Sequence, residues 1–372
     1  MAGVLRVDRA RVMAYRVAAL QLDRRRDLAP GDLAVLDLGV QEYTPGSVQV
    51  GLAARTSAAR VRVGLDDERL CTVWGVRGAP HLHRRAGLVA LAEALWPLSD
   101  ADAAARIAGN QIREGAALGI AAFTATAGAF REAVTAPMPR GEVSTRVSAL
   151  VPPSLTYDCG PCGARHIAGT VFQQAGLAGG VLVESRGAGA TLAPIGGWPG
   201  VPAAARGTGA LLTTYLRLLG PAAPADVAGY LGTKAGALKA GWLGGLAEVE
   251  VDGRTAWLPE QSIDALRDAQ PAAGTRLLPA MDALLQARDR DVLVPDRARQ
   301  KQIWRALGNP GVLLHDGEII GVWRAKAVGR SRVDLTVSPF GTLSAAARRG
   351  VAEESEIVAA ARGAGQARLH IE

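Results

Sequence analysis

The sequence predicts an α+β protein in which tandem winged-helix units are followed by a small antiparallel, β-barrel-like C-terminal domain. Residues 207–258 carry three short helical patterns, followed at once by two alternating strand patterns around the turn dipeptide Asp252-Gly253. That order of elements is typical of a winged helix. Residues 311–340 instead alternate through a run of strands, and the edges of such a run need closure or a cover.

The first winged-helix unit is expected over residues 1–87, with Asp8 as the cap of its first helix. Asp66-Asp67 should form the turn between its two strands. The expected helices and strands, in that order, cover residues 8–21, 32–40, 47–55, 59–65 and 69–76. Residues 8–76 therefore repeat the element order of residues 207–258 without repeating their sequence.

A helical connector is expected over residues 88–140, because apolar residues recur there at helical spacing. The second winged-helix unit, residues 141–205, should contain a helix from Glu142 and another from about Pro161 to Ala175. Two strands joined by a glycine-rich turn should complete it within residues 180–195.

The third winged-helix unit is expected over residues 206–275. Pro224 suits the first turn of its second helix, and Thr233 can cap a third helix that carries Lys234 and Lys239. A helix in this position reads the DNA groove in a helix-turn-helix protein, although many winged helices bind only other proteins.

The C-terminal domain is expected over residues 276–372. It should contain a helix over residues 297–307, an antiparallel meander with turns at Asp316-Gly317 and at residues 329–331, and a final helix over residues 344–362.

Composition favours a folded cytoplasmic protein with an anionic partner. The chain has 372 residues, of which 49% are hydrophobic, and its N-terminus lacks the apolar core of a secretory signal. No window reaches the length of a membrane span, and three cysteines are too few for a disulfide framework. A net charge of +7 favours duplex DNA, although the excess of arginine over lysine also follows from GC-rich codons. We expect a monomer without a membrane partner.

Five spaced motifs together resemble one family, the AlkZ/YcaQ family of bacterial winged-helix DNA glycosylases, which remove alkylated bases. The motifs are LGVQ at 38–41, RGAPHLHRR at 77–85, YLRLLGPAAPADVAGYLG at 215–232, LLPAMDALLQARDR at 277–290 and DGEIIGVW at 316–323. They cover almost the whole chain in the family's order. The resemblance implies a DNA-binding enzyme of base-excision repair, or of resistance to alkylating compounds, that needs no cofactor.

The resemblance places the chemistry at Gln41-Glu42-Tyr43. The family has Gln-x-Gln or Gln-x-Asp here, and these side chains position the attacking water. Gln41 matches the first position, whereas Tyr43 replaces the second glutamine or aspartate. A phenol is neutral at physiological pH and can orient water, but it is a poor base. Two functions therefore remain open, an active glycosylase and a non-catalytic winged-helix DNA-binding protein.

The candidate DNA contacts are basic. His81 and His83 alternate along one face of an expected strand, and they can reach a phosphate or a flipped nucleotide or form a solvated polar edge. The full set of DNA-contact candidates is Arg77, His81, His83, Arg84, Arg85, Lys234 and Lys239. A second charged group, Asp282 with Arg288, Asp289 and Arg290, is explained at least as well by an internal ion-pair network.

Cys159 and Cys162 form a C-x-x-C motif, but the strand and βαβ context of a redox protein are missing around it. His166 adds a third ligand for zinc, yet a structural zinc site needs four ligands and no nearby Cys or His completes the set. We therefore expect no metal site, and we expect Asp158 and Pro161 to begin an ordinary helix.

Overall fold

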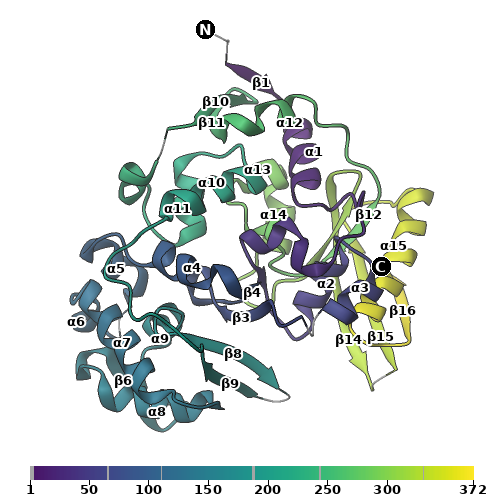
Figure 1. Cartoon of the computed structure of the whole chain (residues 1–372). Coiled ribbons are helices and arrows are strands. Elements are labelled where there is room, and N and C mark those ends of the chain that lie inside the picture. The colour runs from purple at the N-terminus through teal and green to yellow at the C-terminus, as the bar shows by residue number, and fades with distance from the viewer. Residues whose placement is uncertain (1–3, 65–66, 110, 187–188, 243, 330) are drawn as a thin grey trace. The chain divides into compact units, whose positions relative to one another are not determined.

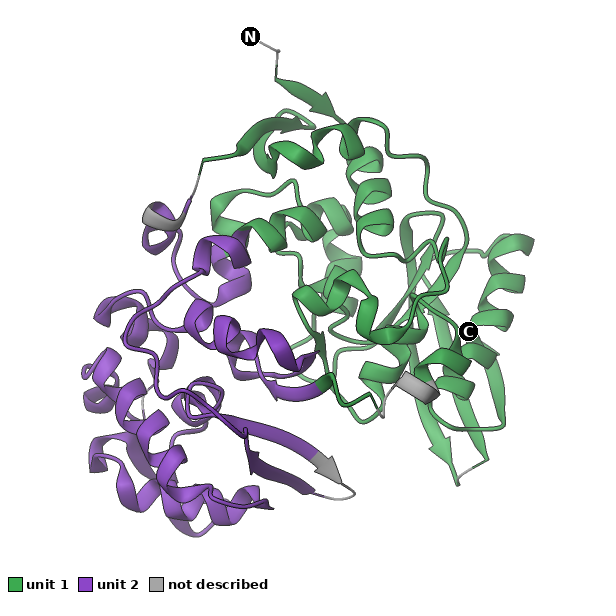
Figure 2. Ribbon diagram, viewed as in Figure 1, with its two compact units in different colours: residues 1–70, 213–227, 244–372 green, residues 71–212, 228–243 purple. Residues whose placement is uncertain are grey.

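The computed structural model describes residues 4–64, 67–109, 111–186, 189–242, 244–329 and 331–372. The chain forms two compact units, each discontinuous in sequence (Figure 2). Unit 1 comprises residues 1–70, 213–227 and 244–372, and unit 2 comprises residues 71–212 and 228–243. Over the described ranges, no helix has the length and apolarity that a bilayer crossing demands.

The N-terminal part of unit 1 begins with Asp8, whose side chain caps the first helix as predicted by accepting from the Arg11 N–H at 2.8 Å. Its helices and strands are β1 (Leu5–Val7), α1 (Arg9–Ala19), η1 (Pro30–Asp32), η2 (Ala34–Asp37), β2 (Val40–Gln41), α2 (Ser47–Ala53) and α3 (Ala58–Gly64) (Figure 1).

Two predictions for this part are wrong. In place of the helix expected over residues 32–40, residues 30–41 form two short 3₁₀ helices and a two-residue strand, because Leu33 between the 3₁₀ helices is extended (φ −70°, ψ 131°). Residues 58–64 form a helix, and the predicted strand over 59–65 is absent from its described part. The Ser57 hydroxyl accepts from the Arg60 N–H at 3.4 Å at its start, and Ala58 favours helix. Residues 65–66, part of the expected hairpin, lie outside the described residues.

Unit 1 also holds a three-stranded sheet in the order β1-β10-β11, with β10 (Leu246–Val251) antiparallel to β11 (Arg254–Pro259). The predicted hairpin turn is confirmed, since Asp252 and Gly253 both have positive φ angles, 45° and 80°. Helices α1 and α12 (Ile263–Arg267) share a hydrophobic core with this sheet.

The C-terminal part of unit 1 is an open five-stranded sheet, a half-barrel, in the order β12-β13-β14-β15-β16. Asp316 and Gly317, with φ 48° and 80°, form the predicted turn. The strands are β12 (Thr275–Leu278), β13 (Gly311–His315), β14 (Glu318–Val328), β15 (Arg332–Pro339) and β16 (Gln366–Ile371). The sequence analysis missed β16, which pairs in parallel with β15 after a crossover through α15 (Ala345–Ala361).

Shorter helices connect the two sheets of unit 1. They are η8 (Ala283–Gln286), α13 (Arg290–Leu293) and α14 (Arg297–Ile303). Helix α14 therefore ends four residues before the predicted Leu307. The predicted final helix is present as α15 (Ala345–Ala361), and the Ser344 hydroxyl caps it.

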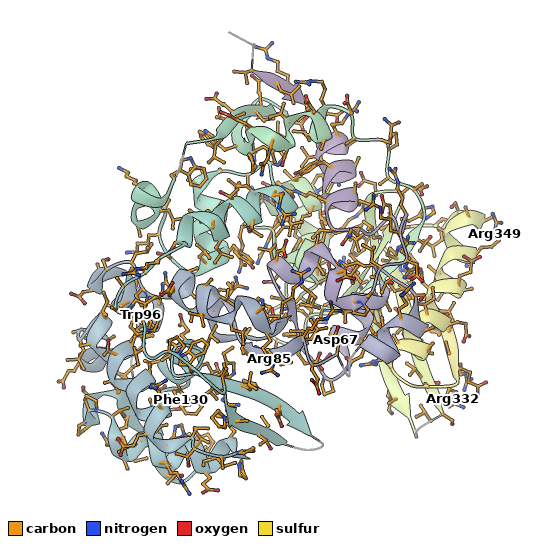
Figure 3. The ribbon with its side chains drawn as sticks, viewed as in Figure 1. Asp67, Arg85, Trp96, Phe130, Arg332 and Arg349 are labelled. Carbon is orange, nitrogen blue, oxygen red and sulfur yellow. The ribbon has the colours of Figure 1, made fainter. Side chains whose placement is uncertain are left out.

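Unit 2 contains most of the other helices. They are α4 (Leu88–Leu95), α5 (Asp100–Ile107), α6 (Arg113–Ala116), α7 (Ile120–Ala133), α8 (Arg140–Leu150) and α9 (Gly169–Gly176). Trp74, Phe130 and Phe172 meet in its core, with ring centroids between 4.7 and 6.0 Å apart. Trp96 and Phe130 lie in this helical part of the chain (Figure 3). Within residues 88–140 the predicted helical character is present, because α4, α5, α6 and α7 lie there.

The strands of unit 2 form small sheets. They are β3 (Leu70–Trp74) and β4 (Pro80–Arg84), which are neighbours, β5 (Met138–Pro139), β6 (Thr156–Cys159), β7 (Ala164–Ile167), β8 (Val181–Arg186) and β9 (Gly189–Pro194). The predicted strands on either side of residues 187–188 are confirmed as β8 and β9. The predicted helix from Pro161 is wrong in its first part, because residues 156–167 form an antiparallel hairpin and α9 begins only at Gly169.

Residues 206–275, expected as the third winged-helix unit, differ from the prediction in their last helix. Helices α10 (Thr208–Leu219) and α11 (Pro224–Leu231) are present, but the third is a 3₁₀ helix, η6 (Ala235–Gly241). Thr233 does not cap it, because the Thr233 hydroxyl donates to the Asp102 carboxylate instead.

Candidate active site

Gln41 lies at the end of a short extended segment and not, as expected, at the end of a helix over residues 32–40. Residues 40–41 form the strand β2, a bend follows, and Gly46 with φ 88° leads into α2. Position 46 requires a glycine, since a positive φ is strained for other residues. The segment 40–46 is therefore short and held at its C-terminal end by a regular helix.

Glu42 is committed to the start of α2. Its carboxylate accepts from the backbone N–H of Gly46 at 2.8 Å and from that of Val48 at 2.7 Å. Burial raises the pKa of Glu42, and these two hydrogen bonds together with Arg362 only partly oppose the rise. Both carboxylate oxygens are therefore occupied by backbone donors, which argues against Glu42 as the base that activates water.

Tyr43 is held by a contact that is remote in sequence. Its hydroxyl oxygen accepts from the backbone N–H of Asn309 at 3.2 Å. Since that oxygen acts as acceptor here, the phenolic proton is still available to a further acceptor.

Gln41 differs from its two neighbours because its side-chain oxygen, Oε1, is buried and has no hydrogen-bond partner among the described residues. Buried polar atoms nearly always have a partner in the protein or in water, so an orphaned acceptor marks a place where a water or a substrate group binds. Gln49 on α2 shares this property in the same part of the chain.

A buried ion pair holds the C-terminal end of α2 in place. The guanidinium of Arg55 donates to both carboxylate oxygens of Asp282, at 2.9 Å each, and the two side chains are 0% and 1% exposed. Arg55 also donates to the Leu20 and Gly51 carbonyls, and Asp282 accepts from the Leu284 N–H. The pair therefore joins the helix that follows the Gln41 segment to residues 282–284.

The charged cluster at residues 282–290 is the ion-pair network that the sequence allows. Besides the Asp282 pair, Asp289 accepts from the buried Arg16 guanidinium, with 3.0 Å between Nη1 and Oδ1. Arg290 lies over the Trp304 ring, 4.8 Å from its centroid. These contacts are internal to unit 1 and describe a structural network.

A cavity of about 130 Å³ lies beside the motif. Thr44, Ser47, Asn309, Arg324 and Arg362 are among its lining residues, whereas Gln41 and Tyr43 are not. Ligand pockets usually measure about 300–1,000 Å³. This cavity is therefore too small to be a complete pocket for a flipped base.

The comparisons with known proteins decide the family. The family described as DNA glycosylase AlkZ-like matches residues 15–361. The chain belongs to this family. An interstrand DNA cross-link repair glycosylase of Streptomyces sahachiroi is 32% identical to it over 123 residues, which is 32% of this chain and 31% of that protein. The chain thus matches about a third of the length of this curated relative.

A solved structure supports the fold over the whole chain. The Streptomyces sahachiroi DNA glycosylase AlkZ matches 99% of this chain and 100% of its own, with a TM-score of 0.77 and 22% identity. At that identity the match establishes the fold alone. The resemblance of the five motifs to this family is confirmed by the family match over residues 15–361.

The predicted DNA contacts lie in unit 2, whereas Gln41 and Tyr43 lie in unit 1. His81 and His83 are buried, 0% and 4% exposed, so the alternative of a solvated polar edge is wrong. Burial lowers the pKa of His81 to about 4, and its Nδ1 lies 2.8 Å from the Ala79 carbonyl oxygen. His81 is therefore neutral at physiological pH and supplies no charge to a phosphate.

The other DNA-contact candidates differ in exposure. Lys234, which precedes η6, and Lys239, which lies within it, are exposed. Arg85 is exposed after β4, and Figure 3 labels it. Arg84 is half-buried. Arg77 packs over the Tyr230 ring, 5.7 Å from its centroid, and donates to the Tyr230 carbonyl. Arg77 thus has a structural contact within unit 2.

Asn309 and Arg362 are the residues near the motif that the sequence analysis missed. Asn309 holds Tyr43, and the Arg362 guanidinium donates to the Pro45 carbonyl at 2.9 Å. Asn309 lies 266 positions after Tyr43, and Arg362 lies 317 positions after Pro45. No local pattern in the sequence signals such long-range partners.

Proposed function

We propose that this protein is a monofunctional DNA glycosylase that hydrolyses the N-glycosidic bond of alkylated purines. The observation that carries the proposal is the buried and unpartnered Oε1 of Gln41, at the position where the family's motif has its first glutamine. Membership of the AlkZ-like family supports the reaction class.

The chemistry requires little acid catalysis. An alkylated purine is already cationic and leaves readily from the sugar, so the enzyme has to aim a water at the sugar carbon and steady the developing positive charge. The Gln41 carbonyl can accept a hydrogen bond from that water, while its amide can donate to another oxygen. Gln41 therefore acts as the positioning group of the proposed reaction.

Tyr43 plays a secondary part in this proposal. Its hydroxyl is already oriented by the Asn309 N–H, and it retains a proton that it can donate to the same water or to a sugar oxygen. The two backbone hydrogen bonds of Glu42 argue against it as the base. The reaction consequently depends on water position more than on proton abstraction.

DNA binding is proposed to use the winged-helix units and the basic residues of unit 2. The element order α10, α11, η6, β10, β11 supports a winged helix over residues 206–275. Lys234 precedes η6 and Lys239 lies within it, and both are exposed, so they can approach phosphates. We infer a cytoplasmic monomer that acts on duplex DNA.

The substrate is proposed to be a purine with an alkyl adduct, including one arm of a cross-link. Support for the cross-link comes from the matched relative, which is an interstrand DNA cross-link repair glycosylase. A 7-methylguanine duplex and a duplex with a cross-linked guanine distinguish a small adduct from a bulky one.

A second function, DNA binding without base excision, is favoured by one observation. Tyr43 occupies the second motif position, and its hydroxyl is engaged by the backbone of Asn309. If the site lacks a second amide or carboxylate, water can be held too loosely for attack.

One experiment separates the two functions. The protein is incubated with a duplex containing 7-methylguanine, and bound duplex and released free base are both measured. An active enzyme releases base in amounts that grow with time, whereas a DNA-binding protein retains the duplex and releases none. Failure to bind the duplex at low salt contradicts both functions.

The DNA surface has its own test. Each phosphate that a lysine neutralises releases counterions and steepens the slope of log affinity against log salt concentration. Replacing both Lys234 and Lys239 with alanine should therefore make this slope shallower by the contribution of about two phosphates. Arg349→Ala, a change at an exposed arginine on α15 in unit 1, is the matched control and should leave the salt dependence unchanged. An unchanged slope for the double lysine variant contradicts the proposed surface.

A further inference from the structure

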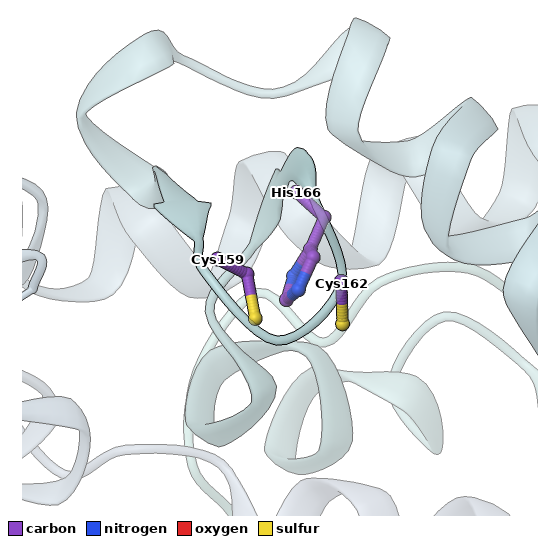
Figure 4. Close-up of side chains that lie close together, drawn as sticks. All are labelled: Cys159, Cys162 and His166. Carbon is purple, nitrogen blue, oxygen red and sulfur yellow. The ribbon is translucent and has the colours of Figure 1, made fainter.

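The hairpin formed by β6 and β7 brings together three side chains that the sequence separates. Its turn, residues 160–163, follows Cys159, and Gly163 has a positive φ of 61°. The two sulfur atoms of Cys159 and Cys162 and a ring nitrogen of His166 all lie within 4.8 Å of one another. Figure 4 shows the His166 ring between the two thiols. This cluster was not predicted, because a helix was expected to begin at these residues.

The hydrogen bond of His166 leaves one ring nitrogen free to act as a ligand. Its Nδ1 lies 2.8 Å from the Ile167 carbonyl oxygen. A carbonyl only accepts, so Nδ1 carries a proton, and in the neutral ring Nε2 presents a lone pair. A histidine that binds a metal commonly donates its other ring N–H to a backbone carbonyl or a carboxylate, which fixes the ring and its tautomer. His166 therefore has the orientation of a metal ligand before any metal binds.

The turn of the hairpin is exposed, as is Cys162 within it. Arg165 links the two strands by donating to the Thr156 hydroxyl at 2.9 Å and to the Asp158 carboxylate at 3.1 Å, and Tyr157 and Ile167 pack on the apolar cluster of unit 2. Tyr157 packs edge-on against His166, with ring centroids 5.0 Å apart. A two-stranded hairpin is marginally stable by itself, so a cross-link between its two strands would order the tip.

We propose that Cys159, Cys162 and His166 form a binding site for zinc or a similar borderline-soft divalent cation. Two thiolates and an imidazole select such a metal over magnesium or calcium, which prefer oxygen ligands. The three protein ligands leave the fourth tetrahedral position to water or to a donor from a partner. On binding, each thiol releases its proton to solvent and the sulfur bonds to the metal.

The geometry requires only a small closure. Zn–S bonds of about 2.3 Å and Zn–N bonds of about 2.0 Å place tetrahedral ligand atoms roughly 3.4 to 3.8 Å apart. The present separations reach up to 4.8 Å, and rotation of the exposed Cys162 side chain shortens them. The proposal is independent of glycosylase activity, because it concerns only this hairpin of unit 2.

The test measures metal in the whole protein. Protein purified under reducing conditions is loaded with zinc, freed of unbound metal, and analysed by elemental mass spectrometry and, after cobalt substitution, by thiolate-to-cobalt charge-transfer absorption. One bound metal per chain with that absorption is expected. Cys159→Ser and His166→Gln should each weaken zinc binding by more than about 100-fold, since even outer partners of metal ligands contribute 10- to 100-fold.

Two further variants keep the test sharp. Cys71→Ala removes a buried cysteine outside the cluster and should leave metal binding unchanged. His166→Cys replaces the imidazole with another soft ligand and should retain binding, which separates loss of a ligand from loss of folding. The proposal is overturned by wild-type protein without metal, by His166→Gln that binds zinc as tightly as wild type, or by a Cys159–Cys162 disulfide as the only product under these reducing conditions.

Discussion

Removal of the Asp282 carboxylate is expected to destabilise unit 1 strongly. Asp282→Ala leaves the Arg55 guanidinium buried, with only the Leu20 and Gly51 carbonyls as acceptors. The pair is 0% and 1% exposed, so solvent cannot replace the lost carboxylate. Breaking a buried pair by removing one partner costs about 3–5 kcal/mol. The Leu284 N–H also loses its acceptor, which adds about 1 kcal/mol.

The assay is urea unfolding followed by far-ultraviolet circular dichroism. Because the chain has two compact units, the transition that the variant shifts is attributed to unit 1 by comparison with wild type. The matched control is Asp264→Ala, since Asp264 pairs with Arg267 at the surface, where the side chains are 82% and 54% exposed. An exposed pair of this kind contributes less than about 1 kcal/mol.

Two outcomes would refute the reasoning. One is a loss below about 1 kcal/mol for Asp282→Ala, equal to that of the surface control. The other is a double variant, Arg55→Met with Asp282→Leu, that is no more stable than Asp282→Ala, because apolar replacement of both partners removes the unpaired charge and should restore much of the stability.

Two further predictions concern unit 2. Burial depresses the pKa of His81 from 6.5 to about 4, so stability should be full above pH 6.5 and fall by about 1.4 kcal/mol per pH unit as the pH drops toward 4. His81→Gln should flatten this part of a stability–pH curve, and an unchanged slope contradicts the assignment. Gly176→Ala places a methyl 2.2 Å from the Trp74 ring and should lower the free energy of unfolding by about 1–3 kcal/mol. Gly128→Ala on α7, with nothing within 4 Å, should be neutral or stabilising, and equal losses in the two variants would argue against overpacking.

Elements with a strong local signal were predictable. Asp8, Ser99 and Ser344 cap helices through their own side chains, and Asp252-Gly253 forms its hairpin because both residues adopt positive φ. In each of these cases the information lies within a few residues of the element. Helix caps and turn dipeptides act locally, and the sequence therefore reveals them.

Elements that depend on distant contacts were not predictable. Strand β16 exists because it pairs with β15, and residues 156–167 form a hairpin in place of the helix that Pro161 suggests. The candidate site shows the same limit. Gln41 is found from its motif, whereas Asn309 reaches Tyr43 only after folding. Long-range pairing overrides local propensity in these places, and no local pattern in a single sequence reveals that pairing.

The central claim is that Gln41 positions the attacking water. Its most direct test is the single-turnover rate of 7-methylguanine release from duplex DNA by wild type, Gln41→Ala and Gln49→Ala, with duplex binding measured for each protein. Gln49 is the matched control, because its side-chain oxygen is also buried and unpartnered in the described structure but lies outside the motif. We predict release by wild type, an unchanged rate for Gln49→Ala, and a loss of about a hundredfold, or about 2.7 kcal/mol of barrier, for Gln41→Ala with binding intact. Equal rates for wild type and Gln41→Ala, or binding without any release by wild type, would contradict the claim.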